Sequence, residues 1–213
     1  MKKHGPWALA VVLASVSASP GLASAADQTT ASRVASSSEP DYQSIDISEL
    51  IQRVAKRTGK QFIMDPRVRA GIPLVGMDAA QVDYARLLAI LTVHQYAAYE
   101  SNGIVKVVPD AISRQLPIPV TTEISPQTLD DEFVTVMYQG KNMCTAHAVP
   151  VLRPLMPQNA HLAAFPQANT LLISDRAANA RRIIDMAERL DKGTPSSQKC
   201  PPETWLPKSE AKK

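Results

Sequence analysis

The chain has 213 residues, and 45% of them are hydrophobic, which is enough for one medium domain or two small domains with apolar cores. Its formal net charge is +3, from 23 Lys and Arg against 20 Asp and Glu. This near balance argues against a nucleic-acid-binding protein, because binding to phosphates requires a strong basic excess.

The first 25 residues have the pattern of a secretory signal peptide. Lys2 and Lys3 precede an apolar stretch at 8–18, and the small residues at 23–25 form the expected cleavage site. The apolar stretch is too short to cross a bilayer as a helix, and no later segment is apolar enough to do so. No cysteine follows the cleavage site, so we expect no lipid anchor. Cleavage would lower the net charge to +1 and release a soluble, periplasmic protein.

An α/β domain is predicted at residues 41–109, after a flexible leader at 26–40 that is rich in Ser, Thr and Ala. Its first helix begins at Asp46, with Glu49 three residues later in a capping-box pattern, and ends at Gly59. Apolar residues recur along this helix at a spacing that places them on one face. They are Ile47, Leu50, Ile51, Val54 and Ala55.

Several short strands and a second helix complete the first domain. The apolar runs at 61–64 and 72–75 are bounded by turn residues and are predicted as strands. The runs at 96–100 and 104–108 flank Asn102-Gly103, the residue pair that most favours a two-residue hairpin turn. A helix is predicted between the runs at 72–75 and 96–100. Its apolar face is formed by Tyr84, Leu87, Leu88 and Leu91.

A linker rich in proline is predicted at 110–131, because each proline removes a backbone donor and stiffens the chain. The second domain, at 132–192, is predicted to follow the order β-α-β-β-α, as in KH domains. After a strand at 133–137, Asn142 is expected to cap a helix. Pro150 lies inside that helix, and its missing N–H should kink or split the helix just before it.

The second half of this domain is predicted as a hairpin followed by a helix. Strands at 162–165 and 171–173 are joined by a turn-forming segment. Asp175 is expected to cap the last helix, which ends before Gly193. The expected buried face of this helix consists of Ala180, Ile183, Ile184, Ala187 and Leu190. The fold class is therefore α+β, with two small mixed-sheet domains.

A disordered tail is predicted at 193–213, where Pro, Ser and Lys dominate and Trp205-Leu206 is the one apolar spot. Cys144 and Cys200 both lie in the exported part of the chain, where a disulfide could form and persist. Two interpretations stay open. Either the two cysteines pair, or Cys144 is a small buried residue and Cys200 an incidental thiol.

Candidate catalytic and metal-binding residues are few. His94, His147 and His161 have no spacing that brings them together with each other. Cys144 and His147 are three residues apart on a predicted helix, but zinc sites need three or four ligands. Cys144 also has no electropositive neighbours that would lower its pKa, so a nucleophile is not indicated. Phosphate-binding loops and hydrolase motifs are absent from the sequence. We expect no enzyme, no catalytic residue, no metal and no cofactor.

Four stretches of the sequence resemble the N-terminal domains of secretins. Gln61–Val68 and Asn102–Val108 resemble the first N-terminal domain of type II secretion secretins, which is also similar to the signalling domain of some TonB-dependent receptors. Tyr138–Asn142 and Asn169–Ala177 resemble the next secretin domain. The resemblance covers roughly residues 41–192, and both domains occur in the family order.

The resemblance implies a periplasmic protein-protein interaction module. In that family the first domain docks inner-membrane components, and the second packs side by side in a ring. The implied function is an adaptor or accessory component of a secretin-based machine. Its partners would be a secretin or an inner-membrane secretion component, in a homo- or hetero-oligomeric ring associated with an outer-membrane complex. The pore-forming domain would follow where this chain ends, so the chain alone should form no channel.

Three alternatives remain. The chain could be a signalling module that contacts an inner-membrane regulator, or a truncated or split secretin. A KH-like nucleic-acid-binding protein is opposed by export, by the near-neutral charge and by the lack of a Gly-x-x-Gly loop.

The predicted partner-binding residues are Ile72, Pro73, Leu74 and Val75. Edge strands of small sheets carry unpaired N–H and C=O groups that can accept a partner strand. Pro73 indicates an edge because proline is tolerated where no ladder bond is needed. Alternatively, Pro73 only protects this edge against aggregation. The charged pairs Asp130-Asp131 and Arg181-Arg182 are interpreted as solvated positions, with partner binding as the alternative.

Overall fold

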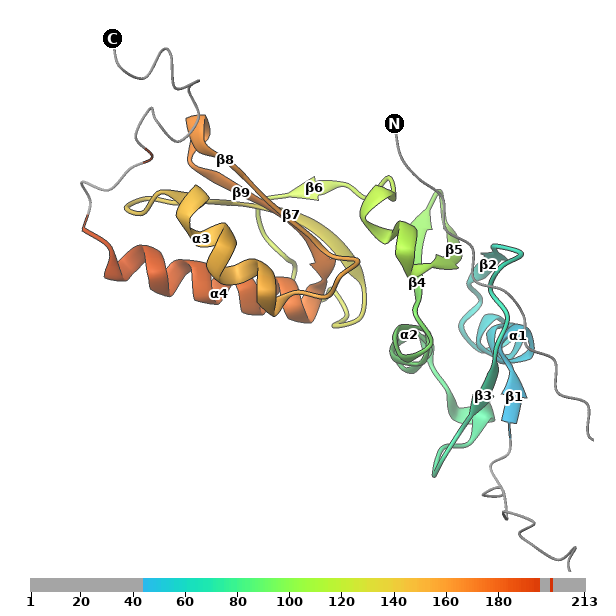
Figure 1. Ribbon diagram of the computed structural model, residues 1–213. Helices are drawn as coiled ribbons and strands as arrows, with labels where there is room; N and C mark the ends of the chain where they lie inside the picture. The colour runs from blue at the N-terminus through green and yellow to red at the C-terminus, as the bar shows by residue number, and fades with distance from the viewer. Residues whose placement is uncertain (1–43, 196–199, 201–213) are drawn as a thin grey trace, which may run out of the picture. The chain divides into compact units, whose positions relative to one another are not determined.

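The computed structural model describes residues 44–195 and Cys200. The predicted signal peptide, the predicted leader and most of the predicted tail therefore lie outside the described residues. Two hydrophobic cores organise the rest. We call Ser44–Gln115 the first block and Val120–Gly193 the second block (Figure 1). Both blocks belong to one compact unit.

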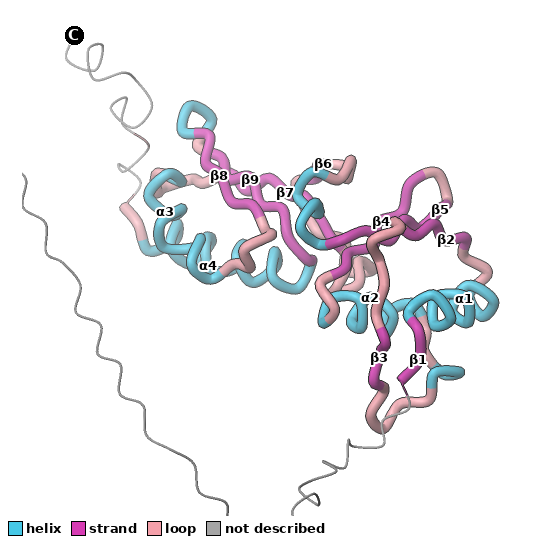
Figure 2. The backbone as a smooth tube through the Cα atoms, turned by 45° about the vertical axis from the view of Figure 1, so that its right-hand side comes forward, coloured by secondary structure: helices cyan, strands magenta, loops and turns pink. Residues whose placement is uncertain are grey.

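The first block contains two helices and two small sheets. Strands β2, β5 and β4 form a three-stranded sheet in which β5 is parallel to β2 and antiparallel to β4, while β1 and β3 form an antiparallel ribbon. Helices α1 and α2 lie between this sheet and the ribbon (Figure 2). The elements are β1 (Ser44–Asp46), α1 (Ile47–Thr58), β2 (Gln61–Met64), β3 (Gly71–Pro73), α2 (Tyr84–Val93), β4 (Tyr96–Ser101) and β5 (Ile104–Pro109).

Local sequence signals explain most elements of the first block. The Asp46 side chain accepts a hydrogen bond from the Ser48 N–H and caps α1, and Gly59 ends the helix at a φ of 70°. Glu49 pairs with Arg53 along the helix rather than completing a capping box. Apart from the half-buried Ala55, the predicted apolar faces of α1 and α2 lie in or against the core. The turn between β4 and β5 adopts positive φ at both of its predicted residues.

The second block is a four-stranded sheet of order β6-β7-β9-β8, in which only β6 and β7 are parallel. Helices α3 and α4 lie on the same side of this sheet (Figure 1). The core between them contains Val136, Leu171 and Ile173 from the sheet and Leu152 and Ile183 from the helices. The elements are β6 (Val120–Thr121), β7 (Phe133–Gln139), α3 (Thr145–Leu152), β8 (His161–Phe165), β9 (Thr170–Arg176) and α4 (Ala177–Gly193). The predicted α+β class and the order β-α-β-β-α are confirmed.

The predicted linker is more structured than a tether. Asp110–Gln115 forms a 3-10 helix, and β6 adds a strand to the sheet of the second block. Val120 pairs with Thr135, and Thr121 pairs with Val136. The β-branched residues of β6 suit this position at the edge of a sheet. The sheet of the second block therefore starts at Val120, inside the segment interpreted as a linker.

The start of α3 differs from the prediction. The helix begins at Thr145, and the preceding residue, Cys144, makes no side-chain capping bond. Asn142 is not the cap, because its side-chain amide donates to the Asp191 carbonyl instead, at 3.1 Å. The N–H of Thr145 is accepted by the side chain of Asn169 at 2.9 Å. A residue from the β8–β9 turn thus replaces a local cap.

Helix α3 is not split before Pro150, so one of the two outcomes predicted for this proline is wrong. Helix α3 is continuous to Leu152 and then tightens into a 3-10 turn at Arg153–Leu155. Pro150 lies in the second turn of the helix, where it removes only one intrahelical hydrogen bond. The short helix therefore tolerates this proline.

The start of α4 also differs from the prediction. Strand β9 continues past Asp175, which is therefore not the cap, and the helix begins at Ala177. The N–H groups of Ala177 and Ala178 donate to the backbone carbonyls of Glu132 and Asp130, at 2.8 and 3.0 Å. Backbone carbonyls from the segment just before β7 thus satisfy the first turn of α4. No helix within residues 44–195 is long and apolar enough to span a membrane.

Candidate protein-interaction site

The β1–β3 ribbon contains the predicted partner-binding residues. Its register places Ile72 opposite Ile45, and the N–H of Ile47 donates to the Ala70 carbonyl at 3.0 Å. The side chain of Ile72 is only 1% exposed and belongs to the core of the first block. Strand β3 ends at Pro73, so the strand is shorter than predicted. The Ile72 side chain therefore anchors the ribbon to the core.

The free side of β3 is followed by exposed apolar residues. Within the described residues, β3 pairs only with β1, so one of its edges has no partner strand. Pro73 is exposed, Leu74 packs partly against the core, and the side chain of Val75 is 71% exposed. Gly76 turns the chain at a φ of 65°, and Met77 is exposed beyond it. Only the outer part of the predicted set is thus accessible to another protein.

Hydrogen bonds hold the loop that leads into β3. The hydroxyl of Tyr96 donates to the Arg69 carbonyl at 2.9 Å and accepts from the Arg69 N–H at 3.2 Å. The guanidinium and backbone N–H of Arg67 donate to Asp65, and these bonds lower the pKa of that carboxyl to about 2. Gly71 lies so close to Ser44 that a Cβ would be 2.8 Å from its Oγ. The loop that leads into β3 is therefore held in place by contacts within the first block.

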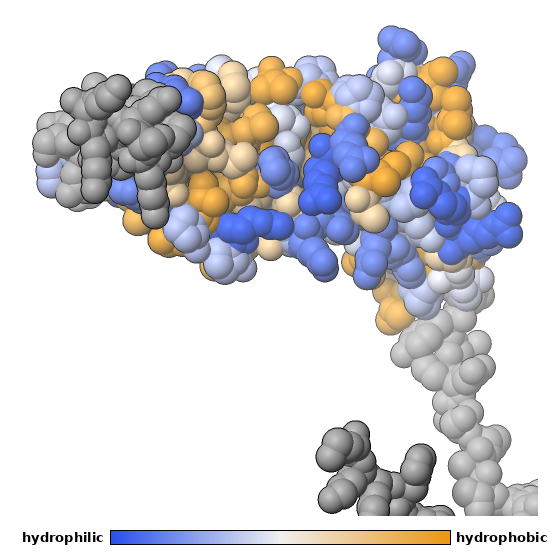
Figure 3. Space-filling view, turned by 45° about the horizontal axis from the view of Figure 1, so that its top comes forward, coloured by the Kyte–Doolittle hydropathy of each residue, from blue (hydrophilic) through white to orange (hydrophobic). Residues whose placement is uncertain are grey.

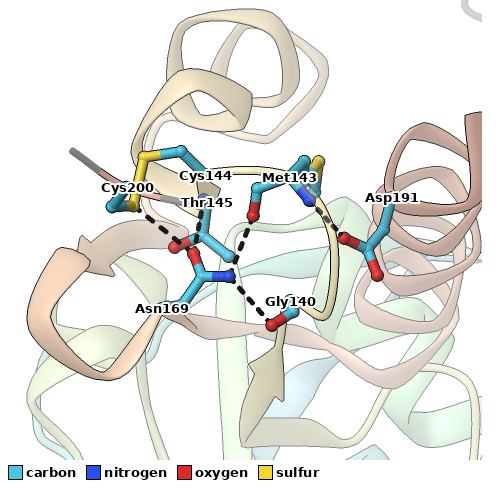
Figure 4. The surroundings of a disulfide bond; sticks show 7 residues. All are labelled: Gly140, Met143, Cys144, Thr145, Asn169, Asp191 and Cys200. Carbon is cyan, nitrogen blue, oxygen red and sulfur yellow. Dashed lines mark hydrogen bonds between the residues drawn. A yellow bond between two sulfur atoms is a disulfide. The ribbon is translucent and has the colours of Figure 1, made fainter. Parts of the chain in front are cut away.

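A second organised region surrounds a disulfide between Cys144 and Cys200 (Figure 4). Asn169, at a φ of 49°, lies at its centre. The Asn169 side-chain amide donates to the carbonyls of Gly140 and Met143, at 2.8 and 2.9 Å. The Cys200 sulfur lies 3.4 Å from the Asn169 side-chain oxygen. The end of the β8–β9 turn, the loop before α3 and the end of the described chain thus meet at one residue.

Asp191 holds the loop before α3 from the other side. Its carboxylate accepts hydrogen bonds from the backbone N–H groups of Lys141, Asn142 and Met143, at 2.7 to 3.0 Å. Burial raises the pKa of Asp191, but these donors and the Tyr138 hydroxyl outweigh burial and hold the pKa below 3.8. Asp191 is buried, whereas the predicted core residue Leu190 is exposed.

Arg176 joins the two blocks. Its guanidinium donates to the Thr92 hydroxyl at 2.8 Å, the Tyr96 carbonyl at 3.1 Å and the Asp110 carboxylate at 3.2 Å. The Arg176 and Asp110 side chains are only 12% and 10% exposed. The side-chain amide of Asn159 also donates to Asp110, at 3.4 Å. A buried ion pair with several hydrogen bonds thus connects α2, β4 and β9.

The charged pairs at 130–131 and 181–182 have structural partners. Arg181 bonds to the Asp130 carboxylate at 2.8 Å and also to backbone carbonyls of the loop at 125–128. Asp131 accepts a hydrogen bond from the Thr92 hydroxyl at 2.9 Å. Arg182 donates to the Leu155 carbonyl at 2.6 Å. The simple description of these residues as solvated is therefore incomplete.

The histidines and cysteines considered as metal ligands or nucleophiles, His94, His147, His161 and Cys144, all lie in the described part of the chain. Its His, Cys, Asp and Glu residues form no group of three or more that could hold a metal ion. Cys144 is buried and paired with Cys200, so no free thiol stands beside His147.

Three residues with large structural roles escaped the sequence analysis. The sequence places Asn169 in a turn and, with Arg176, in a secretin-like stretch, and it places Asp191 near the end of a helix, but it indicates none of their contacts. The positive φ that asparagine tolerates was the one local signal for Asn169. Asp191 and Arg176 act on segments that are distant in the sequence, and no local pattern indicates such contacts.

The comparisons with known proteins agree with this architecture. Residues 40–107 match the family model described as the GspD-like N0 domain. The chain is thus homologous to the N-terminal domains of type II secretion secretins. It is 32% identical to the secretin XcpQ of Pseudomonas aeruginosa over 148 residues, which are 68% of this chain and 22% of XcpQ. It is 30% identical to the secretin PulD of Klebsiella pneumoniae over 77% of this chain and 26% of PulD.

A solved structure supports the same relationship. The Klebsiella pneumoniae type II secretion system outer membrane complex contains PulD, PulS and the PulC HR domain. It matches this chain with a TM-score of 0.59 and 29% identity, over 70% of this chain and 26% of that chain. The alignment with XcpQ is longer than the matched N0 range, so the similarity continues past the first block. The chain spans about a quarter of the length of the curated relatives that it matches.

Proposed function

We propose that this chain is a periplasmic protein-protein interaction module, an adaptor or accessory component of a type II secretion or related secretin-based machine. The observation that carries the proposal is the free edge of β3 with exposed Val75 beyond it, on a block that matches a secretin N-terminal domain. The PulD complex, which contains the PulC HR domain, supports a protein partner for such a block. An inner-membrane component of the machine or a secretin is the expected partner.

Strand addition is the mode of binding that the ribbon favours. A partner strand can pair with the free side of β3, and its apolar side chains can cover Val75 and Met77. The loop before β3 is already held by Tyr96, so little ordering of this chain would oppose binding. Pro73 offers no N–H to the added strand, which restricts the pairing to the positions beside it.

The second block has surfaces suited to side-by-side packing in a ring. Phe165 is exposed at the end of β8, and Val151 and Leu155 are exposed at α3 and the turn after it. Figure 3 shows apolar surface among polar residues on this block. Two different apolar surfaces on one block allow a head-to-tail contact between copies, and such contacts close into rings or extend into filaments.

The direct test is capture of partners with edge variants. The tagged chain is purified from cross-linked, detergent-solubilised envelopes as wild type, Val75→Arg and Val93→Arg. Val75 and Val93 are 71% and 78% exposed, so both arginines should be tolerated by the fold. We expect the wild type and Val93→Arg to recover a secretin or an inner-membrane secretion component. The amount of this partner recovered with Val75→Arg should be at least about tenfold lower. Equal recovery with both variants, or recovery of neither component by the wild type, would contradict the proposal.

A further inference from the structure

A groove lies between α4 and the loop that follows β6. It has a volume of about 570 Å³ and is lined on one side by Ile184, Asp185 and Glu188 of α4. The rest of its lining is formed by Thr122, Glu123, Ile124 and Pro126 of the loop, Met137 and Tyr138 of β7, and Arg181 of α4. None of the contacts described for the β3 edge or for the disulfide region fills this groove.

One wall of the groove is an unpaired strand edge. Strand β6 pairs with β7 only at Thr135 and Val136. Among the described residues, Met137–Gln139 therefore have no strand on that side, although they pair with β9 on the other. Backbone N–H and C=O groups along this edge can bind an extended segment.

The groove combines apolar walls with an acidic rim. Ile124, Met137 and Ile184 provide apolar surface, and Glu123, Asp185 and Glu188 provide carboxylates. The Arg181 guanidinium is already bound by Asp130 and two carbonyls. Asp185 and Glu188 pair with Arg189 and Lys192 on α4, but these are exposed pairs and contribute little. The groove thus suits an extended segment with an aromatic or aliphatic residue followed by a basic one.

The chain's own tail has this composition. Trp205 and Leu206 are followed by Lys208, and residues 201–213 contain three lysines against two glutamates. The disulfide fixes the start of this segment, because Cys200 is bound to Cys144 beside Asn169. The Asn169 amide donates to Gly140, two residues past Tyr138 in the groove wall.

The tether is long enough for Trp205 to reach the groove. Trp205 follows Cys200 by five residues, which span about 17 Å when extended. Along β7, Gly140 and Tyr138 are separated by about 7 Å. A tether of this length gives an effective concentration on the order of 1 mM, so even a weak contact would be occupied.

We propose that residues 204–208 of the chain's own tail dock in the groove between α4 and the Thr122–Pro126 loop. Trp205 would cover its apolar walls, and Lys208 would face its acidic rim. The disulfide would act as the anchor that keeps the tail close. Without it, the tether to Trp205 would start at Thr194, eleven residues away, and the effective concentration would fall about threefold.

The test is a photo-cross-link from position 205 in the full, oxidised chain. Trp205→p-benzoylphenylalanine is introduced, the purified protein is irradiated, and the linked peptides are identified by mass spectrometry. We expect cross-links within one molecule to peptides that contain Thr122–Pro126 or Ile184–Glu188. Mixing isotopically labelled and unlabelled protein distinguishes these from cross-links between copies. Cross-links between copies, cross-links to other regions, or none at all would overturn the proposal.

A matched pair of charge reversals tests the acidic rim. Glu188→Lys changes the groove, and Glu49→Lys is the control on α1. Their side chains are 47% and 51% exposed, and each pairs with a basic residue four positions later. We expect the yield of the groove cross-link to fall about threefold with Glu188→Lys and not with Glu49→Lys. An equal yield with both variants would overturn the proposal. Partner capture through β3 does not enter this test, so failure of one proposal leaves the other standing.

Discussion

At the scale of single residues, buried polar side chains hold the loops of the second block. Asp191 satisfies three consecutive backbone N–H groups before α3, and Asn169 satisfies the first N–H of that helix. The pKa of Asp191 is lower in the folded chain than its ordinary value of 3.8. The stabilisation from its ionised form is therefore present above pH 3.8 and is lost as the pH falls through the lower, folded value.

Replacing Asp191 should destabilise the chain in a pH-dependent manner. We expect Asp191→Asn to lower the free energy of unfolding at pH 7 by about 2 kcal/mol, because hydrogen bonds to a charged acceptor are weakened. The difference from wild type should shrink as the pH falls below 3.8. Urea unfolding at pH 7 and pH 3 measures both effects. Asp185→Asn, on the exposed face of α4, is the control, and an equal loss in the two variants would contradict this role for Asp191.

At the scale of elements, α3 depends on contacts from outside its own sequence. It is short, contains Pro150 and has no side-chain cap of its own. Asn169 from the β8–β9 turn caps it, and the disulfide at Cys144 ties its first turn to Cys200. Tertiary contacts therefore stabilise a helix whose local sequence is weak.

Reduction of the disulfide should lower stability clearly. The bond joins residues separated by 56 positions, and a loop of this size constrains the unfolded chain by about 4 kcal/mol in the chain-entropy description. We expect the urea midpoint of the wild type to fall on reduction. The double variant Cys144→Ala/Cys200→Ala should unfold near the reduced wild type and should not respond to reductant. An unchanged midpoint for the reduced wild type would show that the bond adds no stability.

At the scale of the whole molecule, Arg176 couples the two cores. The Arg176 guanidinium contacts α2, β4 and Asp110, and Asp110 is the first residue of the 3-10 helix that follows β5. Because this ion pair is largely buried, removal of the arginine would leave the Asp110 charge without its partner. Thr92, Tyr96 and Asp110 of the first block would lose their hydrogen bonds to the second block.

Arg176→Ala should therefore weaken the joint between the blocks. We expect a loss of about 3 kcal/mol in the free energy of unfolding, since breaking a buried ion pair leaves an uncompensated charge. The melting curve, followed by circular dichroism, should broaden or separate into two transitions. Arg189→Ala removes an arginine from an exposed pair and should melt like wild type. A single transition at the wild-type temperature for Arg176→Ala would rule out the coupling.

Local signals in the sequence were sufficient for much of the fold. Neighbouring residues form the helix cap at Asp46, the helix end at Gly59 and the turn at Asn102-Gly103. These features can therefore be predicted from the sequence alone. The α+β class and the β-α-β-β-α order followed from the spacing of apolar residues and turn residues. The resemblance to secretin N-terminal domains supplied the family, which these patterns could not.

Long-range contacts account for the remaining differences. Asn142 and Asp175 are residue types that commonly cap helices. However, the first N–H groups of α3 and α4 donate to a side chain and to backbone carbonyls of distant segments. In the candidate site, Pro73 indicated an edge, whereas the burial of Ile72 depends on how the ribbon packs on the core. Whether that edge binds a partner stays a prediction for the capture experiment.

Strand β6 has a consequence for where the second block can be divided from the first. Only two residues long, it shields Thr135 and Val136 of β7 from one side. A fragment that begins at residue 132, where the sequence suggests a domain boundary, would lack this strand and present a longer bare edge. Bare edges of this kind pair with one another between molecules. Such a fragment would be prone to aggregation, whereas one that keeps Val120 and Thr121 would retain its natural cover.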